Sequence, residues 1–79
     1  MQAEEIKNII EAGLPGCQAY VLGEDEVHFE AAVVSDSFLG KSKIAQHKLV
    51  FATLGDRMQQ GVIHALSLKT YTQQQWSEK

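Results

Sequence analysis

The sequence predicts an α+β fold with the element order αββα(α)βα, and three observations predict it. Residues 2–13 and 43–60 repeat apolar side chains at helical spacing. Residues 27–35 and 62–70 instead alternate between two faces, as strands do. The second helical segment is long enough to cross over between these two strands, which predicts that they are parallel neighbours. A three-stranded mixed sheet with helices packed on one face follows.

The first helix is expected at residues 2–13. Its apolar positions are Ala3, Ile6, Ile9 and Ile10, and Leu14 continues the same spacing just after the helix. Glu4 and Glu5 lie in the first turn, where carboxylates favour the helix dipole. Gly13, followed by Pro15, ends the helix.

A hairpin is expected next, with strands at residues 17–22 and 27–35 around the polar turn 23–26. In the second strand one face carries Val27, Phe29, Ala31 and Val33, and the other carries His28, Glu30, Ala32 and Val34. The bulk of Phe29 favours the first of these faces as the core face.

The long helix at residues 43–60 has Ser42 as its candidate N-cap. Its expected inward stripe consists of Ile44, His47, Val50, Phe51, Leu54 and Met58. Gly55 weakens the middle of this helix and predicts a break or kink there, and Gly61 ends it.

The third strand is expected at residues 62–70, where Leu66 and Leu68 mark the core face and His64 shares it. Thr72 is the expected cap of a last short helix at residues 73–76. Its Trp76 is expected to fold back on the body of the protein.

Length and composition indicate one domain, residues 1–79, with a small core. The net charge of −3 argues against a dedicated nucleic-acid binder, which usually carries a basic surface. No apolar run approaches the roughly 20 residues of a membrane helix, and the acidic N-terminus does not resemble a secretory signal. A single Cys17 cannot form an internal disulfide. We therefore expect a cytoplasmic protein that binds no membrane.

Four stretches carry a family resemblance: HFEAAVVSDSFLGKSK at residues 28–43, QHKLVF at 46–51, IHALSLKTYT at 63–72, and Trp76. Together they resemble the BolA family, and the short hairpin turn is most similar to its IbaG-like branch. The resemblance covers residues 27–76. It implies a class II KH-like fold and a role in iron–sulfur or iron homeostasis, usually by pairing with a monothiol glutaredoxin that carries glutathione.

The chain departs from the family pattern at three places. Gln46 and His47 stand where Arg-His is common, and Gln73 stands where Pro is common. The turn at residues 23–26 is acidic, whereas many relatives place a Cys or His there. In the hairpin, only His28, at the far end of that turn, remains as a candidate metal ligand.

The resemblance implies that His64, in the IHAL motif, ligates a bridging [2Fe-2S] cluster shared with the partner. An imidazole ligand raises the potential of such a cluster and makes its ligation sensitive to protonation. His28 is the second candidate, because it begins its strand as His64 begins the next, and neighbouring strands lie about 5 Å apart. With Phe29 inward, however, His28 points away from the face of His64. A structural histidine is the alternative for each.

Two other residues have simpler interpretations. His47 shares a helix face with Phe51 and is interpreted first as a structural histidine at the edge of the core. Cys17 opens an apolar strand and is expected to be a buried thiol. The chain alone is expected to be a monomer. With no Cys cluster or Asp-rich site, it is also expected to hold no cofactor by itself. No nucleophile or carboxylate arrangement of an enzyme stands out, so a non-enzymatic role is predicted.

Residues 38–48 are expected to provide much of the docking surface for the partner. The candidates there for partner or nucleic-acid binding are Phe38, Gly40, Lys41, Lys43, His47 and Lys48. The lysines form a basic patch at a helix N-terminus, which leaves open an alternative function as a KH-like, nucleic-acid-binding transcriptional regulator. Net acidity and the absence of a GxxG loop argue against this alternative, and the absence of GxxxxGK[ST] argues against nucleotide binding.

Overall fold

The structure is a computed structural model that describes residues 2–23, 28–55 and 65–78. It confirms the α+β class and the three-stranded mixed sheet. The elements along the chain are α1 (Ala3–Gly13), β1 (Gln18–Leu22), β2 (His28–Val34), the short 3-10 helix η1 (Asp36–Phe38), α2 (Lys43–Leu54), β3 (Ala65–Tyr71) and α3 (Gln73–Ser77).

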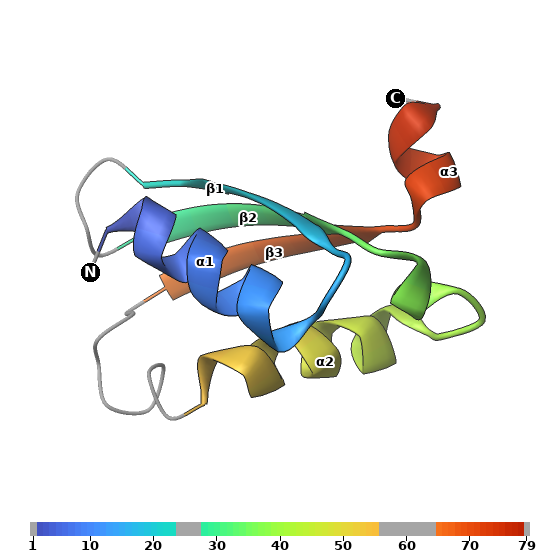
Figure 1. Cartoon of the computed structure of the whole chain (residues 1–79), viewed down its shortest axis with the longest axis horizontal. Coiled ribbons are helices and arrows are strands. Elements are labelled where there is room, and N and C mark those ends of the chain that lie inside the picture. Colours follow the sequence, from blue (N-terminus) through green and yellow to red (C-terminus); the bar gives the residue numbers. More distant parts are fainter. Residues whose placement is uncertain (1, 24–27, 56–64, 79) are drawn as a thin grey trace.

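The sheet has the strand order β1-β2-β3, with β2 in the centre. β1 runs antiparallel to β2, and β3 runs parallel to it, as the hairpin and the crossover predict. Helices α1 and α2 cover one face of the sheet, whereas α3 stands at the far end of β3 (Figure 1). The core lies between the sheet and the two long helices, and its fully buried side chains include Ile6, Ile10, Val33, Phe38, Val50 and Leu54.

The inward face of α2 differs from the expected stripe. Its buried residues are Gln46, Val50 and Leu54, which recur every four positions. Ile44, expected to face inward, is 71% exposed. Successive helical residues are about 100° apart, so Ile44 lies about 200° from Gln46 and faces outward once Gln46 is turned to the sheet. His47 and Phe51 are half-buried at the border of this face.

Helix α2 also ends earlier than expected. Its last residue is Leu54, and Gly55 follows with a φ of 61°, a left-handed conformation that favours glycine. The predicted break at Gly55 is thus the end of the helix. The expected continuation through Met58 to the stop at Gly61 lies outside the described residues.

The other elements agree with expectation to within a few residues. Ser42 caps α2, since its hydroxyl accepts a hydrogen bond from the Ala45 N–H (3.2 Å). Thr72 caps α3 in the same way, accepting from the Gln75 N–H (3.2 Å). β1 begins one residue later than expected and β3 continues to Tyr71. The expected start of the third strand, at residues 62–64, lies outside the described residues.

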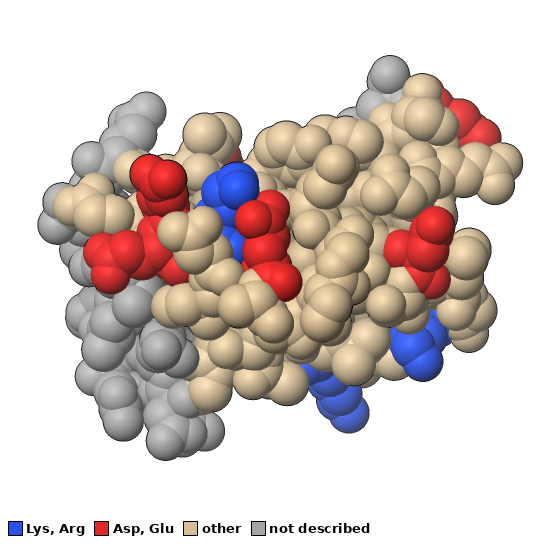
Figure 2. Space-filling model, in the orientation of Figure 1, with Lys and Arg blue, Asp and Glu red and all other residues tan. Residues whose placement is uncertain are grey.

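Charge is distributed unevenly over the surface. Figure 2 shows acidic side chains gathered over α1 and basic side chains along the side of the molecule formed by α2. Helix α1 carries Glu4, Glu5 and Glu11, with Lys7 bonded to Glu11 at 3.0 Å. Among the described helices, none is long and apolar enough to cross a membrane.

Candidate functional site

The sheet end at which His28 lies is formed by the first residues of β2 and β3. The parallel register pairs His28 with Ala65, the residue that directly follows His64 in the sequence. His64 itself lies outside the described residues. The His28 side chain is exposed, while its neighbour Phe29 is in the core, as the alternation predicts. His28 therefore lies on the sheet face that carries Glu30, opposite the face of Leu66 and Leu68.

This sheet end does not amount to a metal site on the part of the chain that is described. Within those residues, no group of three or more His, Cys, Asp or Glu side chains lies close enough together to hold a metal ion. A [2Fe-2S] cluster needs four ligands, most commonly thiolates. The described donor set therefore does not fit a resident cluster of this kind.

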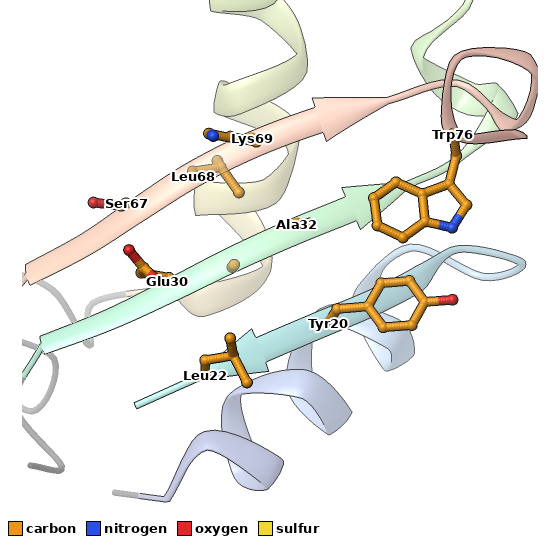
Figure 3. Close-up of a pocket in the computed structure, with 9 residues that line it drawn as sticks. Tyr20, Leu22, Glu30, Ala32, Ser67, Leu68, Lys69 and Trp76 are labelled. Carbon is orange, nitrogen blue, oxygen red and sulfur yellow. The ribbon is translucent and has the colours of Figure 1, made fainter. Parts of the chain in front are cut away.

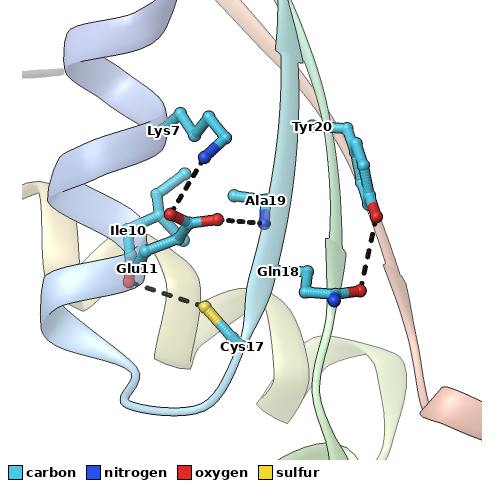
Figure 4. Close-up of polar contacts among 7 residues, drawn as sticks. All are labelled: Lys7, Ile10, Glu11, Cys17, Gln18, Ala19 and Tyr20. Carbon is cyan, nitrogen blue, oxygen red and sulfur yellow. Dashed lines mark hydrogen bonds and ion pairs between the residues drawn. The ribbon is translucent and has the colours of Figure 1, made fainter.

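Cys17 does not supply the missing thiolate. It is only 9% exposed, and its thiol donates a weak hydrogen bond to the Ile10 carbonyl (3.8 Å; Figure 4). Burial raises the pKa of the Cys17 thiol, and the nearby Glu11 carboxylate raises it further. A thiol kept protonated and covered is a poor metal ligand and nucleophile. The expectation of a buried thiol is confirmed.

Glu11 ties α1 to the outer edge of β1. Its carboxylate accepts from the Ala19 N–H at 3.1 Å and from the Lys7 ammonium at 3.0 Å (Figure 4). The hydrogen bond from Ala19, followed by the one from Lys7, lowers the pKa of Glu11 below its usual value of 4.5. The ionised carboxylate thus satisfies a backbone donor on the side of β1 where, among the described residues, the strand has no strand neighbour.

The predicted docking segment, residues 38–48, divides into buried and exposed side chains. Phe38 is fully buried, so the structure places this candidate in the core and not on the surface, because η1 turns its ring inward. The exposed apolar side chains of the segment are Leu39 (62%) and Ile44 (71%). Gly40 has a φ of 75° and forms the turn between them. Lys41, Lys43 and Lys48, close to this apolar pair in the sequence, are all exposed, and the Lys43 ammonium is bonded to the Thr70 carbonyl of β3.

Gln46 is the residue of this segment that sequence reasoning missed. Its amide donates to the carbonyls of Phe38 (3.2 Å) and Lys41 (2.9 Å) and accepts from the Thr70 hydroxyl (2.5 Å). One buried side chain thereby joins the loop before α2 to α2 itself and to β3. A signal was available: Gln46 continues the line of Val50 and Leu54 at a spacing of four.

A hollow of about 220 Å³ lies between α2 and β3. Its lining residues are Lys43, His47, Leu68, Lys69, Thr70 and Tyr71. The Lys43 ammonium donates to the Thr70 carbonyl (2.5 Å) and lies 5.5 Å from the centre of the Tyr71 ring. His47, interpreted from the sequence as a core-edge residue, borders this hollow and is half-buried.

The sheet face opposite α1 and α2 carries a second, larger hollow of about 390 Å³. Figure 3 shows Trp76 reaching over this face from α3, beside Tyr20, with Leu22 further along β1. The Trp76 and Tyr20 rings stack with their centres 5.1 Å apart, which confirms that Trp76 folds back on the body. Glu30 and Lys69 are the charged residues that line it.

Together these features define a small α+β domain with a basic groove along one sheet edge, one face left open by the long helices, and an exposed imidazole at a sheet end. The family described as BolA-like protein matches residues 11–75, so the chain belongs to the BolA family.

Relatives and solved structures agree with this assignment. An uncharacterized protein of Haemophilus influenzae is 36% identical over 76 residues, which cover 96% of this chain and 88% of that relative. The DNA-binding transcriptional regulator BolA of Vibrio cholerae is 45% identical over 53 residues, 67% of this chain, and the match spans 49% of its own length. The structure of a BolA protein homologue from Coxiella burnetii is similar with a TM-score of 0.86 at 41% identity, covering 98% of this chain and 97% of that one.

Proposed function

We propose that the protein is a non-enzymatic, cytoplasmic adaptor in iron–sulfur or iron homeostasis. It pairs with a monothiol glutaredoxin and contributes His64 as one ligand of a bridging [2Fe-2S] cluster. The partner's cysteine and its bound glutathione supply the sulfur ligands. When bound, the cluster adds iron–sulfur redox chemistry, and the role of this chain is to bind the partner and to present an imidazole.

The observation that carries the proposal is the parallel pairing of His28 with Ala65. It brings the start of β2 beside the residue that follows His64 in the IHAL motif. The exposed imidazole of His28 makes this residue the second candidate ligand, although it lies on the face opposite Leu66. The deficit of thiolates in the described donor set supports a shared cluster, because a partner has to complete it.

The docking surface of the proposed complex centres on Leu39 and Ile44. These are large apolar side chains left in water, and the exposed Lys41 and Lys48 lie close to them in the sequence. An apolar centre with a charged rim is the usual composition of a protein interface. The buried Gln46 bonds hold this surface in one conformation before binding, which lowers the ordering cost of association.

The proposal is tested by titrating the protein into cluster-loaded monothiol glutaredoxin and recording visible absorption and circular dichroism. Exchange of a sulfur ligand for an imidazole should change both spectra, with an end point at one protein per bridged cluster. His64→Ala should bind without producing the new spectrum, and His47→Ala should produce it in full. Unchanged spectra with the natural protein, or the full change with His64→Ala, would refute the proposal.

Docking is tested separately by Ile44→Glu, which places a charge in the centre of the proposed surface. Association should weaken by about tenfold or more, since a buried interfacial charge without a partner costs several kcal/mol. Leu22→Glu is the matched control, because Leu22 is equally exposed (70%) but lies on β1. Equal loss for both variants would place the interface elsewhere.

The alternative function is that of a nucleic-acid-binding transcriptional regulator, which the name of the Vibrio cholerae relative favours. Lys41, Lys43 and Lys48 are its candidate contacts, and all three are exposed. Binding to oligonucleotides should then fall with salt in proportion to the number of phosphates neutralised. Reversing the charge of Lys41 and Lys48 should abolish it, and no dependence on these lysines would exclude this use of the surface.

A further inference from the structure

The outer edge of β3 is a candidate for strand addition. In the part of the chain that is described, β3 has a strand neighbour only on its β2 side. The Tyr71 carbonyl faces that side, since it accepts from the Ser35 N–H at 2.9 Å. The Thr70 carbonyl faces the other way, toward the Lys43 ammonium. Because backbone groups alternate along a strand, those of Leu68 share the outward direction of Thr70.

This edge is basic. Lys43 and His47 approach it from α2 and line the hollow with Thr70. Lys69 belongs to β3 itself, and Figure 3 shows its side chain extending past the outer edge of the strand, away from β2. No salt bridge within the described residues involves either lysine. Positive charge on an edge strand disfavours pairing with strands that carry no negative charge. The same charge attracts an acidic strand.

We propose that this edge binds an extended acidic segment of a partner protein, which adds to β3 as a fourth strand. Side chains of an added strand alternate between the two sheet faces. One carboxylate would meet Lys43 and His47 on the α2 side, and the adjacent one would meet Lys69 on the other side. The preferred segment therefore carries two consecutive acidic residues. The inference goes beyond the iron–sulfur function and does not depend on it.

The bond between Lys43 and Thr70 favours acidic residues in the added strand. A strand that pairs with β3 offers its own N–H to the Thr70 carbonyl and displaces the Lys43 ammonium. An acidic side chain gives the released ammonium a new partner, whereas a neutral strand removes one hydrogen bond for each one that it forms there. A peptide is favoured over nucleic acid as the occupant, because a nucleic acid cannot continue the backbone ladder.

The test uses the octapeptide Thr-Val-Thr-Glu-Glu-Thr-Val-Thr, acetylated and amidated, added to the ¹⁵N-labelled protein. We expect saturable shifts of the Leu68 and Thr70 amide signals and slower hydrogen exchange at both. Lys43→Gln and Lys69→Gln should each weaken binding by about two- to fivefold, the range of a single exposed ion pair. Lys48→Gln, an exposed lysine of α2 outside the hollow, should leave it unchanged. Melting curves check that each variant is folded.

Three comparison ligands keep the outcome decisive. The same peptide with Lys-Lys at the centre should not bind. Of the two peptides with N-methyl groups on alternate backbone nitrogens, the one whose methyl groups face β3 should not bind, whereas the other should. Equal binding of the Lys-Lys peptide or of both N-methylated peptides would overturn the proposal, as would shifts confined to Tyr20 and Trp76 on the open face. The absence of saturable shifts at millimolar peptide would also overturn it. Stronger binding of a short single-stranded oligonucleotide at the same amides would assign the edge to nucleic acid instead.

Discussion

Gln46 connects three parts of the molecule through one side chain. Its amide is bonded to two loop carbonyls and to the Thr70 hydroxyl, and it is 5% exposed. A buried polar group of this kind contributes little when satisfied and is costly when its partners are left alone. The described residues contain no buried side-chain polar atom without a hydrogen-bond partner.

Replacing Gln46 by Leu should therefore destabilise the protein by about 2–4 kcal/mol, because the buried Thr70 hydroxyl loses its acceptor and the Lys41 carbonyl loses its donor. Urea denaturation measures the change in the free energy of unfolding. Thr70→Val combined with Gln46→Leu should cost less than the sum of the two single changes. Additive costs would mean that the two side chains do not depend on each other. Gln74→Leu, on the exposed side of α3, is the control.

Glu11 gives the stability a dependence on pH with a defined sign. The Ala19 and Lys7 hydrogen bonds lower its pKa in the folded protein, so folding favours the ionised form. The contribution of the ionised Glu11 to stability is complete above pH 4.5. It is lost as the pH falls below 4.5 through the lowered pKa of Glu11 in the folded protein. Glu11→Gln keeps an acceptor for Ala19 and removes the charge.

The variant Glu11→Gln should thus be less stable than the natural protein at pH 7, and the difference should shrink as the pH falls below 4.5. Thermal or urea unfolding at a series of pH values measures it. Glu4→Gln, an exposed carboxylate on the same helix, should show a smaller difference. A gap between Glu11→Gln and the natural protein that stays constant down to pH 3 would contradict the assigned bonds.

The helices were predictable as elements, but their inward faces were predictable only in part. Helix α1 has a plain apolar stripe, and its buried residues Ile6 and Ile10 are those that the spacing predicts. Helix α2 has apolar residues on more than one face, so hydrophobicity alone does not choose between Ile44 and Gln46. The choice depends on the hydrogen bonds that Gln46 makes to Thr70 and to the loop carbonyls. Thr70 is distant in the sequence, and the carbonyls belong to the backbone, so the apolar pattern of the helix does not reveal either partner.

The contact between α1 and α2 was not predictable from either helix. Gly13 lies where a Cβ atom would be 2.6 Å from Thr53 Cγ2 and 2.7 Å from Thr53 Cβ. The sequence identifies Gly13 as a helix stop, which is correct, since α1 ends there. Its second role, to let the helices approach each other, appears only in three dimensions.

Gly13→Ala should therefore destabilise the protein by about 1–3 kcal/mol, the cost of overpacking, although alanine is the better helix former. Asn8→Ala, at an exposed position of α1, should be neutral or slightly stabilising for the same propensity. The melting temperatures of the two variants, compared with that of the natural protein, measure both effects. Stabilisation by Gly13→Ala would show that α1 and α2 are not in close contact at this point.

For the molecule as a whole, order and pairing of strands followed from the sequence. The parallel pairing of β2 with β3 follows from the length of the connecting helix, and the hairpin follows from a polar turn between two strands. The open face, the basic edge of β3 and the buried position of Phe38 did not follow, because each depends on how elements pack. The KH-like character of the fold and the ligand role of His64 stay predictions.

The central prediction is that an imidazole of this chain binds the iron of a cluster held with a monothiol glutaredoxin. The most direct measurement is pulsed electron paramagnetic resonance of the reduced complex, prepared with ¹⁵N-histidine only in this protein. We predict a ¹⁵N coupling of the strength of an iron-bound imidazole. It should disappear in His64→Ala and persist in His47→Ala. A complex without this coupling, or one that keeps it in His64→Ala, would contradict the assignment of His64.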